Sequence, residues 1–192
     1  MWQDLSTFIR ARKNFVITTH INPEGDAIGS EVALATFLRD AGKTATIVNS
    51  SATPANCSFM DPAGGIRVYP EQYAAKIMED ADAVVIVDVN NWAHVGPFGD
   101  EIRKHDTPRV CIDHHVGADE GFAGIMASDT TAAAAGLLVY DLIKFMNGNI
   151  TSRIAAAIYT AILTDTGSFR FSNTDERVFV SHLRKARRAP SY

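Results

Sequence analysis

Short apolar runs rich in valine and isoleucine restrict the fold of this sequence more than any other feature. They lie at residues 16–19, 45–48, 83–89 and 109–113. Consecutive apolar residues are typical of strands covered on both faces, whereas a strand with one wet face alternates apolar and polar residues. Helical patterns separate these runs along the chain. The alternation predicts an α/β fold with a mostly parallel sheet flanked by helices.

Helices are expected between these strands at residues 27–41, 71–80 and 99–105. Gly42 follows the first of them and provides a C-cap signal, because glycine readily adopts the left-handed backbone that ends many helices. The first fifteen residues mix charged and apolar side chains at helical spacing, without the continuous apolar core of a signal peptide. No apolar run is long enough to cross a membrane, so we expect a cytoplasmic location without membrane contact.

The C-terminal third has a different character. Residues 121–126 are a candidate for one further strand, and alanine-rich helices are expected at 130–146 and 151–163, on either side of an Asn-Gly-Asn breaker. Small side chains at so many helix positions indicate close helix packing. Residues 176–192 begin as an amphipathic helix and end in basic residues, which predicts a terminal helix or linker after one domain at 1–175.

Bulk composition limits what the chain can bind. The formal net charge of -4 makes long-range attraction to polyanions weak. A phosphate-bearing ligand would therefore need local positive charge, and metal ions are one source of it. The two cysteines, Cys57 and Cys111, have no zinc-binding spacing, and the second lies inside an apolar run, as expected for a reduced, buried thiol.

Polar residues that can bind metal follow three of the apolar runs. His20 follows the first run, Asp88 lies near the end of the third, and Asp113, His114 and His115 end the fourth. Ligands of open α/β sheets bind beyond the carboxyl ends of the strands. If these strands are parallel neighbours, the sequence predicts that the side chains meet at one edge of the sheet.

The segment after the first run carries three candidate ligands, His20, Glu24 and Asp26. A turn containing proline and glycine can aim side chains at these spacings into one cavity, where a regular strand would separate them. The alternative is that Asp26 only caps the helix that begins at Ala27, while Gly25 serves the turn. Capping explains Asp26, but it explains neither His20 nor Glu24.

The second and third segments each have a structural alternative. Asp88 leaves a fully apolar strand, where a carboxylate is costly unless it is paired or bound to metal, although it could instead accept backbone hydrogen bonds from the next turn. Trp92 suits core packing better than base stacking. His114 and His115 would face opposite sides of a strand, so both can serve one site only where the strand becomes a loop.

Asp165, in the fourth segment, ends an apolar helix, where the helix dipole opposes a negative charge and a cation would favour it. With Glu24, Asp26 and Asp88 it makes four carboxylates, which would repel one another and raise one another's pKa if packed closely. Two divalent cations would cancel this charge. Because His20 and His114 add imidazoles, the mixed ligand set favours two Mn²⁺ ions, with Mg²⁺, Co²⁺ or Zn²⁺ as substitutes.

The four segments resemble, in order, motifs I to IV of the DHH phosphoesterase superfamily over about residues 14–175. They are most similar to its branch of oligoribonuclease/3′-phosphoadenosine 5′-phosphate phosphatases. The matching stretches are HINPEGDAIGS (20–30), VVIVDVNNWAHVG (84–96), DHH (113–115) and TDTGSFRF (164–171). The resemblance implies manganese-dependent hydrolysis of phosphate esters, with a small nucleotide or short single-stranded RNA as substrate.

The resemblance also implies a role for each ligand. One manganese ion would be held by His20, Glu24 and Asp88. The other would be held by Asp26, Asp88, His114 and Asp165, with Asp88 shared. His115 would face the substrate phosphate and Asp113 would orient the site, while a water between the two ions would attack phosphorus in line with the leaving oxygen.

Two positions depart from the family pattern. Glu24 stands where the family usually has aspartate, and His94 stands where this branch often has arginine. Family members usually continue into a smaller C-terminal substrate-binding domain. This chain ends at Tyr192, so we expect it to lack that domain.

Substrate contacts and function are less constrained. Ser30, Thr131 and Arg170 are candidate phosphate contacts, although each also suits a cap or a surface position. Alternative functions are a cyclic dinucleotide phosphodiesterase, a pyrophosphatase-like enzyme, a single-strand exonuclease, or a truncated nucleotide-binding or regulatory module without turnover. A Rossmann-type dinucleotide binder is disfavoured, since the first turn lacks the G-x-G-x-x-G spacing. A homodimer is left open.

Overall fold

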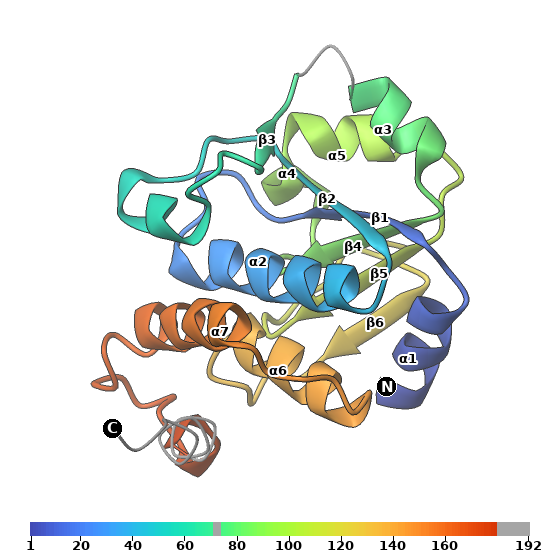
Figure 1. Ribbon diagram of the computed structural model, residues 1–192. Helices are drawn as coiled ribbons and strands as arrows, with labels where there is room; N and C mark the ends of the chain where they lie inside the picture. The colour runs from blue at the N-terminus through green and yellow to red at the C-terminus, as the bar shows by residue number, and fades with distance from the viewer. Residues whose placement is uncertain (71–73, 180–192) are drawn as a thin grey trace.

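A sheet of six parallel strands in the order β3-β2-β1-β4-β5-β6 forms the centre of the protein (Figure 1). The computed structural model describes residues 1–70 and 74–179. The strands are β1 (Asn14–Thr18), β2 (Thr44–Asn49), β3 (Arg67–Val68), β4 (Ala83–Val87), β5 (Arg109–Asp113) and β6 (Ile125–Ser128). The chain runs outward from β1 to β3 and then crosses to β4 on the other side of β1. This reversal makes the carboxyl ends of β1 and β4 the switch point of the sheet, where α/β folds bind ligands.

The predicted α/β fold is confirmed, and the four apolar runs form β1, β2, β4 and β5. The possible strand at 121–126 was placed too early, because β6 begins only at Ile125. An apolar residue stands at position 122 because its side chain is buried outside the strand. Phe122 packs on Trp92, with ring centres 4.6 Å apart. The two-residue strand β3 was not predicted, since both of its residues are exposed and no apolar run marks them.

Strand side chains alternate between two core layers, as the pleat requires. In β1, Phe15 and Ile17 pack on one face of the sheet and Val16 packs on the other. Helices cover both faces (Figure 1). The first face is covered by α1 (Trp2–Arg10), α2 (Gly25–Asp40), α6 (Ala135–Phe145) and α7 (Ser152–Asp165). The second is covered by α3 (Ala74–Asp80), α4 (Trp92–Val95) and α5 (Pro97–Ile102).

The helices follow the sequence prediction with shifted ends. Gly42 has a φ of 76° just after α2, which confirms the predicted C-cap. Helix α6 begins later than residue 130, because Asp129 accepts hydrogen bonds from the backbone and hydroxyl of Thr131 and so forms a turn there. The short helices α4 and η1 (Ala55–Met60) were not predicted. No helix in the described ranges is long and apolar enough to cross a membrane.

Two parts of the predicted helices fall outside the described residues. Residues 71–73, the start of the helix expected at 71–80, are one of them. Residues 180–192, most of the predicted terminal helix or linker, are the other. Within that last segment, residues 176–179 are helical.

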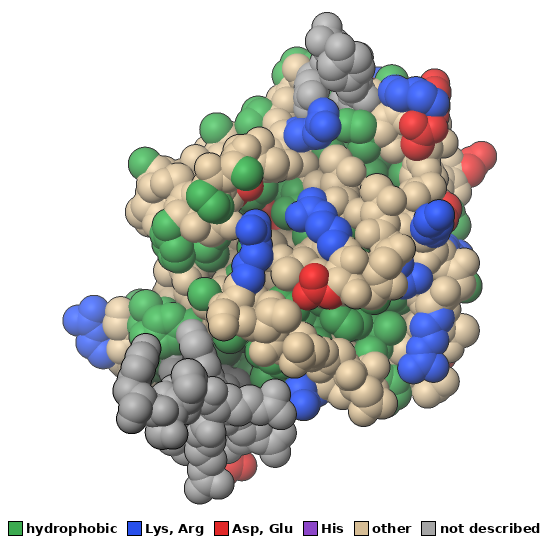
Figure 2. Space-filling model, viewed as in Figure 1, with side chains coloured by type: hydrophobic (Ala, Val, Ile, Leu, Met, Phe, Trp, Pro, Cys, Tyr) green, Lys and Arg blue, Asp and Glu red, His purple; other side chains and the backbone are tan. Residues whose placement is uncertain are grey.

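Lysine and arginine side chains of the described residues are scattered singly on the face shown in Figure 2. This distribution agrees with the net charge of -4.

Close helix packing brings α2, α6 and α7 together beneath the switch point. A Cβ atom added at Gly29 of α2 would collide with the carbonyl oxygen of Ala157 in α7, and one at Gly136 of α6 would collide with Ala161. Only glycine permits these approaches. The predicted close packing of the alanine-rich helices is thus confirmed, and it places the start of α2 beside the end of α7.

Gly29→Val should lower the free energy of unfolding by at least about 2 kcal/mol, because the obstructing atom belongs to the α7 backbone and cannot rotate away. Urea unfolding followed by far-UV circular dichroism measures the change. Gly124→Ala is the matched control, since a Cβ there meets only an atom at 3.6 Å. Equal stability of Gly29→Val and the parent protein would contradict the packing argument.

Candidate metal centre

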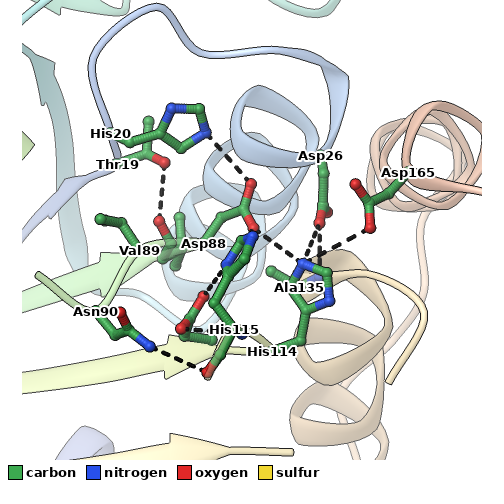
Figure 3. A network of polar contacts seen from close by, with 12 residues as sticks. Thr19, His20, Asp26, Asp88, Val89, Asn90, His114, His115, Ala135 and Asp165 are labelled. Carbon is green, nitrogen blue, oxygen red and sulfur yellow. Dashed lines mark hydrogen bonds and ion pairs between the residues drawn. The ribbon is translucent and has the colours of Figure 1, made fainter. Parts of the chain in front are cut away.

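Six side chains predicted as metal ligands meet at the carboxyl edge of the sheet, and Figure 3 labels all of them except Glu24. They come from the loop after β1, the start of α2, the residues that follow β4 and β5, and the last position of α7. They are His20, Glu24, Asp26, Asp88, His114 and Asp165. The structure therefore brings together every ligand candidate of the sequence, from all four segments.

The His20 imidazole is fixed by its own loop. Its Nδ1 lies 2.8 Å from the carbonyl oxygen of Ile21, which can only accept, so Nδ1 carries a proton. Nε2 then faces two carboxylates, with Glu24 Oε1 at 3.2 Å and Asp88 Oδ2 at 3.5 Å. The hydrogen bond to the backbone thus aims the ligating nitrogen at the acidic groups, as second-layer contacts do in metal sites.

His114 repeats this arrangement from the other side. Its Nδ1 lies 3.1 Å from the carbonyl oxygen of Ala132 and donates to it. Its Nε2 faces three carboxylates: Asp88 Oδ1 at 3.4 Å, and Asp26 Oδ2 and Asp165 Oδ2 at 3.7 Å each. The strand ends at Asp113, so His114 already lies in a loop, where adjacent histidines can serve one site.

Asp88 lies between the two imidazoles. Its φ of 59° falls in the left-handed region, which is uncommon for residues other than glycine and often marks functional sites. Burial works to raise the Asp88 pKa, but the adjacent His114 and His20 outweigh burial and lower it. Asp88 Oδ1 and His114 Nε2 are buried, and neither makes a hydrogen bond with the described residues.

Asp26 is fully buried and is held by α6. Its Oδ2 accepts a hydrogen bond from the Ala135 amide at 2.7 Å, and its Oδ1 accepts from the Gly136 amide at 2.9 Å and from the Ser30 hydroxyl at 3.2 Å. Helix α2 begins at Gly25, with Glu24 as its N-cap, so Asp26 does not cap its own helix. It satisfies the first amides of α6 instead.

Asp165 is the last residue of α7, and its side chain is 31% exposed. The Asn173 amide donates to the carbonyl oxygens of Asp165 at 3.0 Å and Ala133 at 3.2 Å, which ties the end of α7 to the residues before α6. Residues 167–169 follow with φ values of 56°, 60° and 66°. Three left-handed residues in succession turn the chain away directly after the carboxylate.

His115 projects beside this cluster and is oriented by Asp113. The Asp113 carboxylate is buried and accepts hydrogen bonds from the His115 backbone amide at 3.1 Å and from its Nδ1 at 2.8 Å. Asn90 donates to the His115 carbonyl oxygen at 3.0 Å. The hydrogen bond that His115 donates to Asp113 raises the His115 pKa. The ring is 55% exposed, so its Nε2 is available to a ligand.

The electrostatics of the cluster favour added positive charge. Burial lowers the His20 pKa, but Asp88 and Glu24 outweigh burial and raise it to about 10. Burial also lowers the His114 pKa, but Asp88 and Asp26 raise it to about 9. Burial and the charge of Asp88 raise the Asp26 pKa well above its ordinary value, and burial raises the Asp165 pKa. The imidazoles therefore hold protons at neutral pH, where a cation can replace them.

The donor atoms form groups whose spacing suits metal ions. Ligand atoms that share one ion, with bonds of about 2.1 Å, stand about 3–3.5 Å apart. Two of the groups whose ligand atoms all lie within 4.8 Å of one another are His20 with Glu24 and Asp88, and Asp26 with His114 and Asp165. The buried, unbonded Asp88 Oδ1 and His114 Nε2 lie where an ion would bind them. The residues present thus fit a metal centre.

The sequence matches the DHH family, N-terminal domain, over residues 14–162. This chain belongs to the DHH family. The segment Asp113-His114-His115 is the triplet that gives the family its name, and it follows β5 directly.

Known proteins resemble this chain in sequence, in fold or in both. The bifunctional oligoribonuclease and PAP phosphatase NrnA of Thermus thermophilus is 32% identical over 84% of this chain and 46% of its own length. An exopolyphosphatase-related protein from Bacteroides fragilis has a TM-score of 0.89 at 27% identity, over 96% of this chain and 56% of its own. Exonuclease RecJ bound to manganese has a TM-score of 0.57 at 12% identity, over 95% and 47%, which shows the shared fold alone. This chain spans about half the length of the curated relatives it matches.

The three predicted phosphate contacts lie in different environments around the DHH centre. Ser30 is fully buried and donates a hydrogen bond to Asp26, so it holds this predicted metal ligand in place. Thr131 is exposed and bonds to Asp129. Arg170 is exposed, and its Nε donates to the Gly167 carbonyl oxygen at 3.0 Å. Neither of these hydrogen bonds brings Thr131 or Arg170 to the cluster.

The two departures from the DHH pattern are both accommodated at the edge of the centre. The longer Glu24 side chain still reaches His20. His94 is exposed on α4, its Nδ1 lies 3.0 Å from the Asn91 side-chain nitrogen, and its carbonyl oxygen accepts from the Ile21 amide at 2.7 Å. Helix α4 is thus tied to the loop of His20.

Sequence analysis missed Asn90, which is buried and holds the loop of His115. A polar residue two positions after Asp88, still within a buried stretch, was the available signal. It also missed the amides of Ala135 and Gly136, because backbone donors carry no sequence signature.

Affinity for a divalent cation should rise with pH. His20 and His114, with raised pKa values of about 10 and 9, carry protons at pH 7 that the cation must displace. Each displaced proton should strengthen apparent binding up to about tenfold per pH unit, levelling off above about pH 9–10. Titration calorimetry with Mn²⁺ in buffers of different ionisation enthalpy counts the released protons. An affinity that is constant from about pH 6 to 9 would contradict the displacement of protons from His20 and His114.

Proposed function

We propose that residues 1–175 form the catalytic domain of a manganese-dependent phosphoesterase that hydrolyses short oligoribonucleotides or 3′-phosphoadenosine 5′-phosphate. The observation that carries the proposal is the convergence of four carboxylates and two imidazoles around Asp88 and His114, whose facing atoms Oδ1 and Nε2 are buried without a hydrogen bond. Such an arrangement is unfavourable for folding unless a cation is bound.

Two ions would divide these ligands. The first would bind His20, Glu24 and Asp88. The second would bind Asp26, Asp88, His114 and Asp165. Asp88 suits the shared position, since its two oxygens face different imidazoles, at 3.5 Å and 3.4 Å. Manganese accepts this mixture of oxygen and imidazole ligands better than magnesium does, and the solved RecJ neighbour holds manganese.

His115 would act on the substrate directly, and the buried Asp113 would orient its ring. When bound, the ions would polarise the phosphoryl group and supply an activated water. His115 donates a hydrogen bond from Nδ1 to Asp113, its side chain is 55% exposed, and the raised pKa favours the protonated ring. The protonated ring can donate a hydrogen bond to a phosphoryl or leaving oxygen. Asn90 keeps this loop in place through the His115 carbonyl.

The substrate class rests on the relatives. NrnA of Thermus thermophilus is described as an oligoribonuclease and PAP phosphatase, and it is the relative with 32% identity. A cyclic dinucleotide phosphodiesterase and a binding module without turnover are the alternatives.

Asp88→Asn should abolish manganese-dependent phosphate or mononucleotide release, with a loss of kcat of at least about a hundredfold, because the shared charge is removed while size is kept. The assay compares 3′-phosphoadenosine 5′-phosphate, a diribonucleotide and a cyclic dinucleotide. Asp40→Asn, at the exposed far end of α2, is the control and should keep full activity. Substrate binding without turnover at every manganese concentration would favour the binding module instead.

His115→Gln should lower kcat by about a hundredfold or more at saturating Mn²⁺ while leaving metal affinity nearly unchanged.

Asp113→Asn should change how activity depends on pH. Since Asp113 raises the His115 pKa, its loss lowers that pKa, and the protonated form disappears at lower pH. The alkaline limb of the kcat/KM profile should therefore move to lower pH. An unmoved limb would show that His115 is not the titrating group.

A further inference from the structure

A cavity lies at the opposite edge of the sheet, near the first residues of β5 and β6. Its volume is about 440 Å³, within the range of small-molecule sites. Residues of α1, of the segment between α5 and β5, and of the start of β6 line it. Arg103, His105 and Arg109 give this lining a basic character. Strand β5 separates the cavity from the metal centre by about 13 Å, four residue steps.

Arg109, the first residue of β5, is incompletely satisfied. Its Nε is buried and has no hydrogen-bond partner among the described residues. Its Nη1 makes only a long contact of 3.4 Å with the His105 carbonyl oxygen. No carboxylate in the described ranges lies within ion-pair distance of its guanidinium. A buried N–H without an acceptor is unfavourable, so the described residues leave Arg109 incompletely satisfied.

A second guanidinium adds to the charge at this place. The central carbons of Arg103 and Arg109 lie 5.7 Å and 5.6 Å from the same ring centre, that of Trp92. The ring face attracts both cations but cancels neither charge. Arg103 pairs only weakly, at 3.7 Å, with the exposed Asp100. Asp106 also lines the cavity, but it is exposed and its repulsion of an anion is screened by water.

We propose that this cavity binds a phosphate group, either free or carried by a small nucleotide. Two guanidinium groups match a doubly charged oxyanion, and the planar fork of arginine binds two of its oxygens at once. The His105 ring already faces Glu101, with Nε2 3.3 Å from Oε1. The site is distinct from the metal centre, because no metal-ligand candidate lines it.

Nuclear magnetic resonance of the ¹⁵N-labelled chain, loaded with diamagnetic Mg²⁺, tests this directly. Titration with inorganic phosphate, AMP and adenosine should give a saturable shift of the Arg109 Nε–H resonance and of amides at 103–109 with phosphate or AMP, but not with adenosine. Shifts with AMP alone would identify a nucleotide as the source of the phosphate. Equal shifts with adenosine, or no saturable shift with any probe, would overturn the proposal.

Three variants localise the binding. Arg109→Lys keeps the charge but loses the fork, and should weaken phosphate binding roughly tenfold. Gly124→Leu should block the cavity without disturbing the fold, because a Cβ at this exposed position meets only the Arg109 carbonyl oxygen at 3.6 Å. Arg10→Gln removes an equal charge from an exposed position of α1 and should bind as the parent does. Unchanged binding in both cavity variants, with dispersed spectra that show intact folds, would refute the site.

Discussion

Repulsion among four carboxylates at one sheet edge is the constraint on which the rest of this structure depends. Asp26 and Asp88 are buried, and the carboxylates of Asp88, Asp26 and Asp165 all face one imidazole nitrogen, that of His114. Charges this close in the interior are tolerated only with compensating positive charge. The protein supplies part of it through two imidazoles whose pKa values are raised. Metal ions would supply the remainder. This requirement explains why the polar groups lie together at the carboxyl ends of β1 and β4.

Helix packing and site geometry are parts of one construction. Gly29 and Gly136 allow α2, α6 and α7 to approach closely, and that approach sets the first amides of α6 against Asp26. The same packing brings the last residue of α7 to His114. A carboxylate held by backbone amides has little freedom to reorient. The ligand positions are therefore fixed by the core before any ion arrives, as precise metal sites require.

The features that could be predicted from the sequence are those with a local signal. The runs that became β1, β2, β4 and β5 are buried on both faces, and the six ligand candidates each interrupt a local pattern. Other features depend on distant partners. Phe122 looked like part of a strand because its packing on Trp92 leaves no periodic trace. The amides that hold Asp26 lie 109 and 110 residues away from it. The cytoplasmic location and the homodimer stay predictions.

The ligands are distributed unevenly along the chain, and this has a consequence for biosynthesis. The group of His20, Glu24 and Asp88 is complete once β4 has docked on β1. The group that includes Asp165 cannot form until α7 has left the ribosome, nearly eighty residues later (165 − 88 = 77). A nascent chain therefore passes through a stage in which one half of the centre can recruit an ion while Asp26 still lacks the helix that will hold it.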